Sequence, residues 1–99
     1  MKPVRLRKGA KHDLREAVSW YRQRDPALAD RFLNEVYKTI ELIERFPGSG
    51  GPVFAVADST IRQLPVNDFP YQIVFQRLEH RTAVLAIAHE RRKPGYWND

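Results

Sequence analysis

Two helical patterns meet within residues 14–43, LREAVSWYRQRDPALADRFLNEVYKTIELI. On both sides of the break the apolar residues recur at steps of three or four, which is the spacing of an amphipathic helix. They are Leu14, Ala17, Val18 and Tyr21 in the first half and Ala29, Phe32, Leu33, Val36, Ile40 and Ile43 in the second. Asp25-Pro26 marks the break, because aspartate caps free backbone N–H groups and proline fits the first helical position. With so short a connector the two helices, the first covering residues 10–24, must run antiparallel and share one apolar face.

That shared face needs a second layer, and strand patterns on either side of the helices supply it. Residues 4–7 alternate apolar and basic side chains, the two-residue period of a half-buried strand. A segment rich in glycine and proline begins at Pro47 and opens a flexible loop, whose residues 50–59 have no assigned role. Strands follow at residues 60–64, 71–78 and 82–89. The predicted element order is β-α-α-β-β-β.

The last strand determines the order of the sheet. Residues 82–89 are apolar at nearly every position, as in a central strand with both faces covered. Strand alternation places Leu85 and Ile87 on one face and Val84, Ala86 and Ala88 on the other. We expect the first strand to pair beside this one, which gives the sheet order 1-4-3-2. The predicted fold class is α+β, with a helical hairpin packed on a small, mainly antiparallel sheet in a single domain of residues 1–99.

Composition narrows the classes of function. The chain of 99 residues is 42% hydrophobic, enough for one core, and its formal charge of +5 attracts polyanions such as nucleic acids or acidic proteins. It has no cysteine, and its three histidines lack the spacing of zinc ligands, so no disulfide and no metal site is expected. No nucleotide-binding glycine motif or catalytic triad pattern occurs, so we expect no cofactor. No apolar run approaches the roughly 20 residues of a membrane-spanning helix, and residues 1–5 do not resemble a signal peptide, so a cytoplasmic protein is expected.

A basic and aromatic segment follows the last strand: His89-Glu90-Arg91-Arg92-Lys93-Pro94-Gly95-Tyr96-Trp97. Arginine and lysine bind phosphate or carboxylate groups, and the aromatic rings offer faces for bases or apolar side chains. Pro94-Gly95 is a turn signal, so the two aromatics can fold back across the sheet. Two interpretations stay open. The first is a solvated strand exit whose aromatics cap the core, and the second is a target-binding surface made of Arg91, Arg92, Lys93, Tyr96 and Trp97.

With this element order, the chain resembles the RelE/ParE toxin superfamily, the toxin half of bacterial type II toxin-antitoxin pairs. The resemblance runs nearly end to end, and it depends on several short pieces in register. The pieces are Asp13-Leu14, Glu16-Ala17, Trp20-Tyr21, Arg31-Phe32-Leu33, Phe46-Pro47, Phe69-Pro70-Tyr71, Ala86-Ile87-Ala88-His89, Arg91-Arg92 and Tyr96-Trp97. The resemblance implies toxin activity, which composition and periodicity alone do not.

Two activities recur in that superfamily. RelE-like toxins cut messenger RNA on the ribosome, whereas ParE-like toxins bind DNA gyrase and trap it without an active site of their own. Cleavage of RNA requires an acid or base and cations that stabilise the phosphorane, and RelE-like members place lysines and arginines across the middle strands. Between the second helix and the basic segment this chain offers only Arg62, Arg77 and Arg81. The resemblance therefore favours the ParE-like branch, and it implies a gyrase poison whose contact residues are those of the basic and aromatic segment, with no catalytic residue.

Two alternatives remain. As a ribosome-dependent endoribonuclease, the chain would use His89, Arg62, Arg91 and Tyr96. Each also has a structural interpretation, since His89 can be a packing histidine that hydrogen-bonds locally and Arg62 can pair with a helix carboxylate. As an inactive toxin fold, the chain would serve only as a corepressor that binds its antitoxin.

The resemblance also implies the partners. We expect a cognate acidic antitoxin, a segment of which lies against the sheet edge or the helical hairpin. We expect operator DNA to be bound only through the antitoxin, because nothing in this chain resembles a helix-turn-helix reader.

Overall fold

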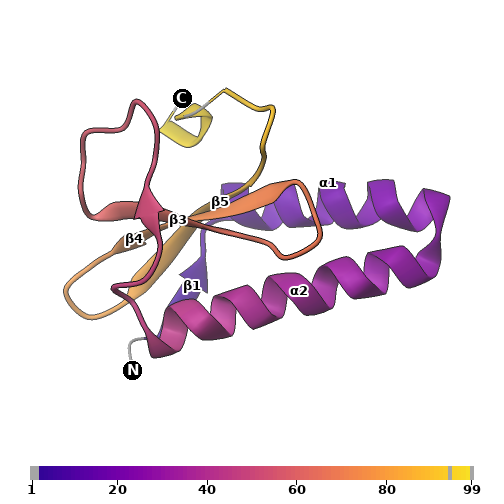
Figure 1. The fold of residues 1–99 in the computed structure, drawn as a ribbon, viewed down its shortest axis with the longest axis horizontal. Coiled ribbons are helices and arrows are strands. Elements are labelled where there is room, and N and C mark those ends of the chain that lie inside the picture. The colour runs from indigo at the N-terminus through magenta and orange to yellow at the C-terminus, as the bar shows by residue number, and fades with distance from the viewer. Residues whose placement is uncertain (1–2, 94, 99) are drawn as a thin grey trace.

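Asp25 ends one helix and begins the next in the computed structural model, which describes residues 3–93 and 95–98. Its carboxylate Oδ1 accepts a hydrogen bond of 3.0 Å from the backbone N–H of Ala27. The predicted hairpin is confirmed as α1 (Lys8–Arg24) and α2 (Pro26–Arg45), which run side by side in Figure 1. α1 begins at residue 8 rather than residue 10, because the carbonyl oxygen of Arg7 already accepts a helical hydrogen bond. No helix among the described residues is long and apolar enough to cross a membrane.

Five strands form the sheet in the described part of the chain. They are β1 (Val4–Leu6), β2 (Gly51–Pro52), β3 (Ile61–Pro65), β4 (Tyr71–Arg77) and β5 (Thr82–His89), and a short 3-10 helix, η1 (Tyr96–Asn98), follows. The order across the sheet is β1-β5-β4-β3-β2. β1 runs parallel to β5, and the other neighbours are antiparallel. The α+β class and the order of the four longer strands are as predicted. The prediction of a sheet with only four strands is wrong, because β2 adds a fifth.

The additional strand, β2, lies inside the loop that was predicted to be flexible. Its two residues pair with β3 at Gln63 and Arg62. Glycine and proline are disfavoured in strands, and proline is tolerated at a sheet edge because no neighbour needs its N–H. The pairing therefore depends on tertiary contact with β3 and has no sequence signal of its own.

A β-bulge in β5 changes which face each residue covers. Ala86 pairs with Val74 of β4. Val84 pairs with the next residue of β4, Phe75, so Leu85 between them has no partner on that strand. An unpaired residue of this kind interrupts the alternation of side chains. Val84 and Ile87 accordingly face the helices, whereas Leu85 lies with Ala86 on the opposite face. For this reason two predictions are wrong: that Leu85 shares a face with Ile87, and that Val84 shares one with Ala86 and Ala88.

Two apolar clusters cover the two faces of the sheet. The cluster under the helices contains a group of aromatic rings, in which Phe32 lies 5.1 Å from both Phe69 and Tyr71 between ring centroids. The second cluster, on the opposite face, is formed by Val53, Ile61, Val74, Ala83, Leu85, Ala86 and Ala88, against which Val56, Leu78, Tyr96 and Trp97 pack. Figure 1 shows the C-terminal segment beside the loop that follows β2. The end of the chain thus covers a face that the helices leave open.

Candidate functional site

The basic and aromatic segment turns sharply after β5. The backbone N–H of Arg92 donates to the carbonyl oxygen of His89 at 2.9 Å, which closes a tight turn. In the predicted Pro94-Gly95 turn, Gly95 has a φ of +85°, a conformation that favours glycine. Pro94 lies outside the described residues. The chain then returns to the sheet through η1.

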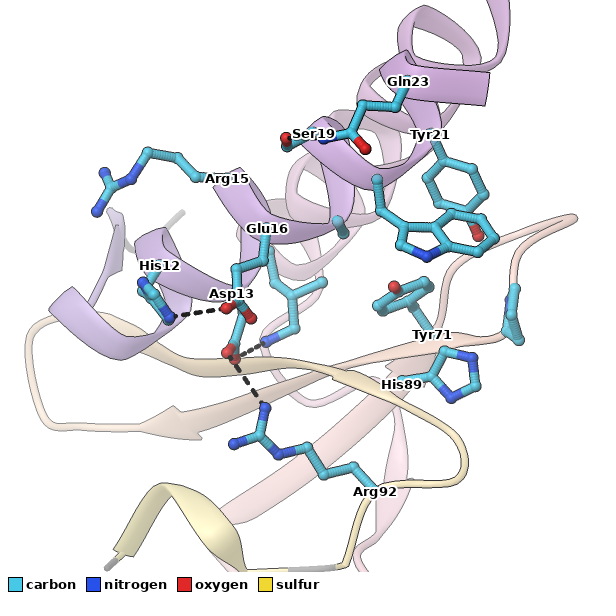
Figure 2. A pocket seen from close by; sticks show the side chains of 14 residues that line it. His12, Asp13, Arg15, Glu16, Ser19, Tyr21, Gln23, Tyr71, His89 and Arg92 are labelled. Carbon is cyan, nitrogen blue, oxygen red and sulfur yellow. Dashed lines mark hydrogen bonds and ion pairs between the residues drawn. The ribbon is translucent and has the colours of Figure 1, made fainter. Parts of the chain in front are cut away.

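A buried carboxylate on α1 holds this segment in place. Asp13 is 9% exposed, and its Oδ2 accepts hydrogen bonds from the Ile87 backbone N–H at 3.1 Å and from the Tyr96 hydroxyl at 2.7 Å. Arg92 Nη1 lies 4.0 Å from Asp13 Oδ1, and Figure 2 shows the two side chains pointing toward each other. One side chain therefore connects α1, β5 and the C-terminal segment.

The two aromatics of the segment are occupied by packing. Tyr96 and Trp97 pack on the second cluster with ring centroids 5.5 Å apart, and the Arg92 guanidinium stacks 3.7 Å from the centre of the Tyr96 ring. Burial raises the pKa of the Tyr96 phenol above its ordinary value of 10.0, and the hydrogen bond to Asp13 raises it further. The aromatics thus cap the core, as one of the two interpretations proposed. Arg91, Arg92 and Lys93 remain exposed and able to contact a partner.

The four residues of the ribonuclease hypothesis do not converge. Arg62 Nε donates to the carbonyl oxygen of Ser49 at 3.2 Å, and its Nη2 donates to that of Gly50, so the expected pairing with a helix carboxylate is wrong. Arg62 pairs with the fifth residue of β4, while His89 pairs with the first. At about 3.3 Å per residue, these positions are about 13 Å apart along the strand. Arg62 therefore anchors the segment that leads into β2, away from His89.

His89 lies at the edge of a groove of about 820 Å³ between α1 and the ends of β4 and β5 (Figure 2). Its ring packs edge-on against Tyr71 at 5.1 Å, and its Nδ1 accepts a hydrogen bond of 3.1 Å from the Arg91 backbone N–H. These are the contacts of a packing histidine that hydrogen-bonds locally. On the other wall Trp20 is 50% exposed, and the Arg24 guanidinium stacks 3.3 Å above its ring. The described residues contain no group of three or more histidines and carboxylates that could hold a metal ion.

Asp13 is the site residue that sequence reasoning missed. Its sequence position matches the family resemblance but predicts no role for it. A signal was present, since Ala10, Asp13 and Ala17 recur at helical spacing, which places an aspartate on the buried face of α1. Aspartate is almost never fully buried unless it is paired. A charged residue in an apolar stripe therefore predicts buried donors nearby.

Tyr96 gives the fold a dependence on alkaline pH. Above about pH 10 the unfolded chain loses the phenolic proton and the folded protein keeps it, so the unfolded state binds fewer protons and the free energy of unfolding falls as pH rises. The slope is at most about 1.4 kcal/mol per pH unit, and solvent screening of this half-buried group reduces it. Burial also raises the pKa of Tyr21 and Tyr71, whose contribution is common to all variants. Urea unfolding of Tyr96→Phe from about pH 9 to about pH 11 should show a shallower decline than the parent chain, and an equally steep decline would contradict this assignment.

Comparison with known proteins identifies what the chain is similar to. The sequence model of a family described as "ParE toxin of type II toxin-antitoxin system, parDE" matches residues 4–94. A solved chain of the chromosomal ParDE TA system from P. aeruginosa aligns with a TM-score of 0.76 and 15% sequence identity, covering 90% of this chain and 96% of that chain. At this identity the likeness shows the fold. Comparison with curated protein sequences gives no significant match.

Proposed function

The chain belongs to the ParE toxin family of type II toxin-antitoxin systems, and on that premise we propose that it arrests growth by binding DNA gyrase and trapping it. The strongest support for gyrase binding over RNA cleavage is that two of the ribonuclease candidates, Arg62 and Tyr96, are already held by contacts within the fold. Backbone carbonyls hold the Arg62 guanidinium, and the Asp13 carboxylate holds the Tyr96 hydroxyl. What remains available on the basic segment is a set of exposed cations, which suits a contact with another protein.

The chemistry of RNA cleavage would need more than these residues offer. His89 would serve as the acid or base, but its ring packs on Tyr71 and its Nδ1 accepts from the Arg91 N–H, while the Tyr96 ring that would stack on a base packs on the second cluster instead. A cation that stabilises the phosphorane must reach it, but Arg62 lies about 13 Å from His89 along the sheet. Inhibition through binding requires neither group.

A cognate antitoxin is the second partner that we propose. The toxin has a formal charge of +5, so an acidic segment would bind it with complementary charge. An acidic segment of the antitoxin would lie against the sheet edge or the helical hairpin. The groove of Figure 2 lies beside α1 of that hairpin. Operator DNA would be reached through the antitoxin.

A supercoiling reaction tests this function. The purified chain is titrated into gyrase and relaxed plasmid, and both lost supercoiling and accumulated cleaved DNA are scored, with antitoxin added back as the control. We expect inhibition that the antitoxin reverses. No inhibition at concentrations that stop cell growth would overturn the proposal, and transcript cleavage in the same cells would then identify a ribonuclease. A chain that leaves growth unaffected when expressed alone would be a corepressor only.

The exposed cations provide a direct prediction. The double substitution Arg91→Ala and Lys93→Ala should weaken gyrase inhibition about tenfold, because each lost charge pair at the rim of an interface contributes up to about 1 kcal/mol. Folding should be unchanged, since both side chains are exposed. Arg22→Ala with Lys38→Ala removes the same net charge from exposed helix positions and should leave inhibition within about twofold of the parent. Equal effects of the two pairs would show that net charge alone matters.

A further inference from the structure

Phe54 stands out among the apolar side chains that face solvent. It is 82% exposed, whereas the other exposed large hydrophobic residues among those described range from 43% for Leu42 to 59% for Phe46. Full burial of a phenylalanine contributes about 1.5 to 3 kcal/mol, and this ring forgoes nearly all of it. Its position is therefore not explained by the stability of the fold.

The loop that carries Phe54 is held on both sides of it. Val53 is 6% exposed in the second cluster, and Val56 packs against the same cluster. The Val56 N–H donates to the carbonyl oxygen of Val53 at 3.1 Å, which closes the turn, and Ala55 within it has a φ of +64°. A non-glycine residue in that conformation costs about 1 to 2 kcal/mol and persists where its surroundings determine it. The fold thus presents the ring outward in a defined turn.

The turn borders the same cavity as the C-terminal basic segment. This cavity of about 240 Å³ lies on the face of the sheet away from the helices, and its floor includes Val74 and Ala88. Phe54 lines it from the β2 loop, and Arg92, Lys93 and Trp97 line it from the end of the chain. We call Phe54, Glu90, Arg92, Lys93 and Trp97 the loop-tail surface. It combines one protruding aromatic ring with two cations and a single carboxylate.

We propose that Phe54 is the aromatic anchor with which the loop-tail surface binds the toxin's protein target, and that it enters an apolar pocket rimmed by carboxylates. The inference rests on the proposed function, because it names the contact through which gyrase would be held. Aromatic residues that fill a pocket, surrounded by contacts that exclude water, dominate the energetics of many protein interfaces. The charge of the loop-tail surface favours an acidic protein target over a second copy of this chain and over nucleic acid. A second copy of this chain would bring cation against cation, and a phosphate backbone would require a longer track of cations than the two that line the cavity.

Substitution of Phe54 tests the proposal in the full-length chain. Phe54→Ala should weaken gyrase inhibition at least about tenfold, Phe54→Trp should restore most of it, and binding of the antitoxin should stay within about twofold. Phe46→Ala is the matched control, because it removes an exposed phenylalanine at the end of α2 and should leave inhibition unchanged. Both alanine variants should keep the parent's thermal midpoint, so that any loss reports a lost contact.

Several outcomes would overturn the anchor. Inhibition by Phe54→Ala equal to that of the parent would refute it, and lost antitoxin binding with retained inhibition would assign Phe54 to the antitoxin surface. Binding of a single-stranded oligonucleotide that depends on Phe54 would assign it to nucleic acid. If the parent chain itself leaves gyrase unaffected, the proposed function fails. The same variants are then compared for growth arrest, where only a loss specific to Phe54→Ala would support the anchor.

Discussion

Replacement of Asp13 by alanine is expected to lower the free energy of unfolding by about 2 to 4 kcal/mol. The substitution removes the acceptor of the Ile87 backbone N–H and of the Tyr96 hydroxyl. A buried donor left without a partner costs about 1 to 3 kcal/mol, and the better helix propensity of alanine returns only about 0.5 kcal/mol. Because Tyr96 and Arg92 would also lose their contact on α1, the C-terminal segment should loosen. Equilibrium urea unfolding measures the change in stability, and amide hydrogen exchange measures the loosening.

Two variants show whether the carboxylate itself is responsible. Glu16→Ala removes an exposed carboxylate on the same helix, which pairs with the exposed His12 at 3.2 Å, and should change stability by less than about 0.5 kcal/mol. Asp13→Asn keeps an oxygen for the Ile87 N–H at nearly the same volume, so its cost should lie between the two. If Asp13→Ala were no worse than Glu16→Ala, water would be replacing the carboxylate, and the segment would be held by its aromatics alone.

The parts of the fold that follow from local pattern were predictable. Two apolar stripes with Asp25 between them determine the helical hairpin, and the apolar last strand lies, as predicted, inside the sheet between β1 and β4. β2 was not predictable, since its glycine and proline pair only because β3 lies beside them. The bulge at Leu85 was equally hidden. In a strand that is apolar on both faces, a shift of alternation leaves no mark in the sequence.

The candidate site was predictable in its charges and not in its contacts. Exposed cations such as Lys93 were identified from the sequence, and the family resemblance is confirmed by the match over residues 4–94. Tyr96 was assigned to target binding, although the structure directs its hydroxyl inward to Asp13. Phe54 received no role, because a loop has no period from which exposure can be inferred. Only the tertiary arrangement brings that loop beside the end of the chain.

Deletion of residues 91–99 is expected to destabilise the fold by about 4 kcal/mol, a large share of the roughly 5 to 15 kcal/mol by which native domains are stable. The deletion uncovers the second cluster, where Val53 and Val74 are 6% and 1% exposed. Each half-buried aromatic that is lost takes about 1 to 1.5 kcal/mol of apolar burial with it. Asp13 also loses the phenol that donates to it, which costs about another 1.5 kcal/mol for a hydrogen bond to a charged group. Circular dichroism and urea unfolding of the truncated chain measure the effect.

This expectation decides how the basic segment must be tested, because a truncation removes charges and core together. If the shortened chain unfolds, its loss of growth inhibition says nothing about Arg91 or Lys93. The double alanine variant of those two residues keeps Tyr96 and Trp97 in place, so it separates target contact from stability. A truncated chain as stable as the parent would show that the aromatics cover the second cluster without stabilising it. In that case truncation should weaken inhibition at least as much as the double substitution does, because it also removes Arg92 and Trp97 from the loop-tail surface.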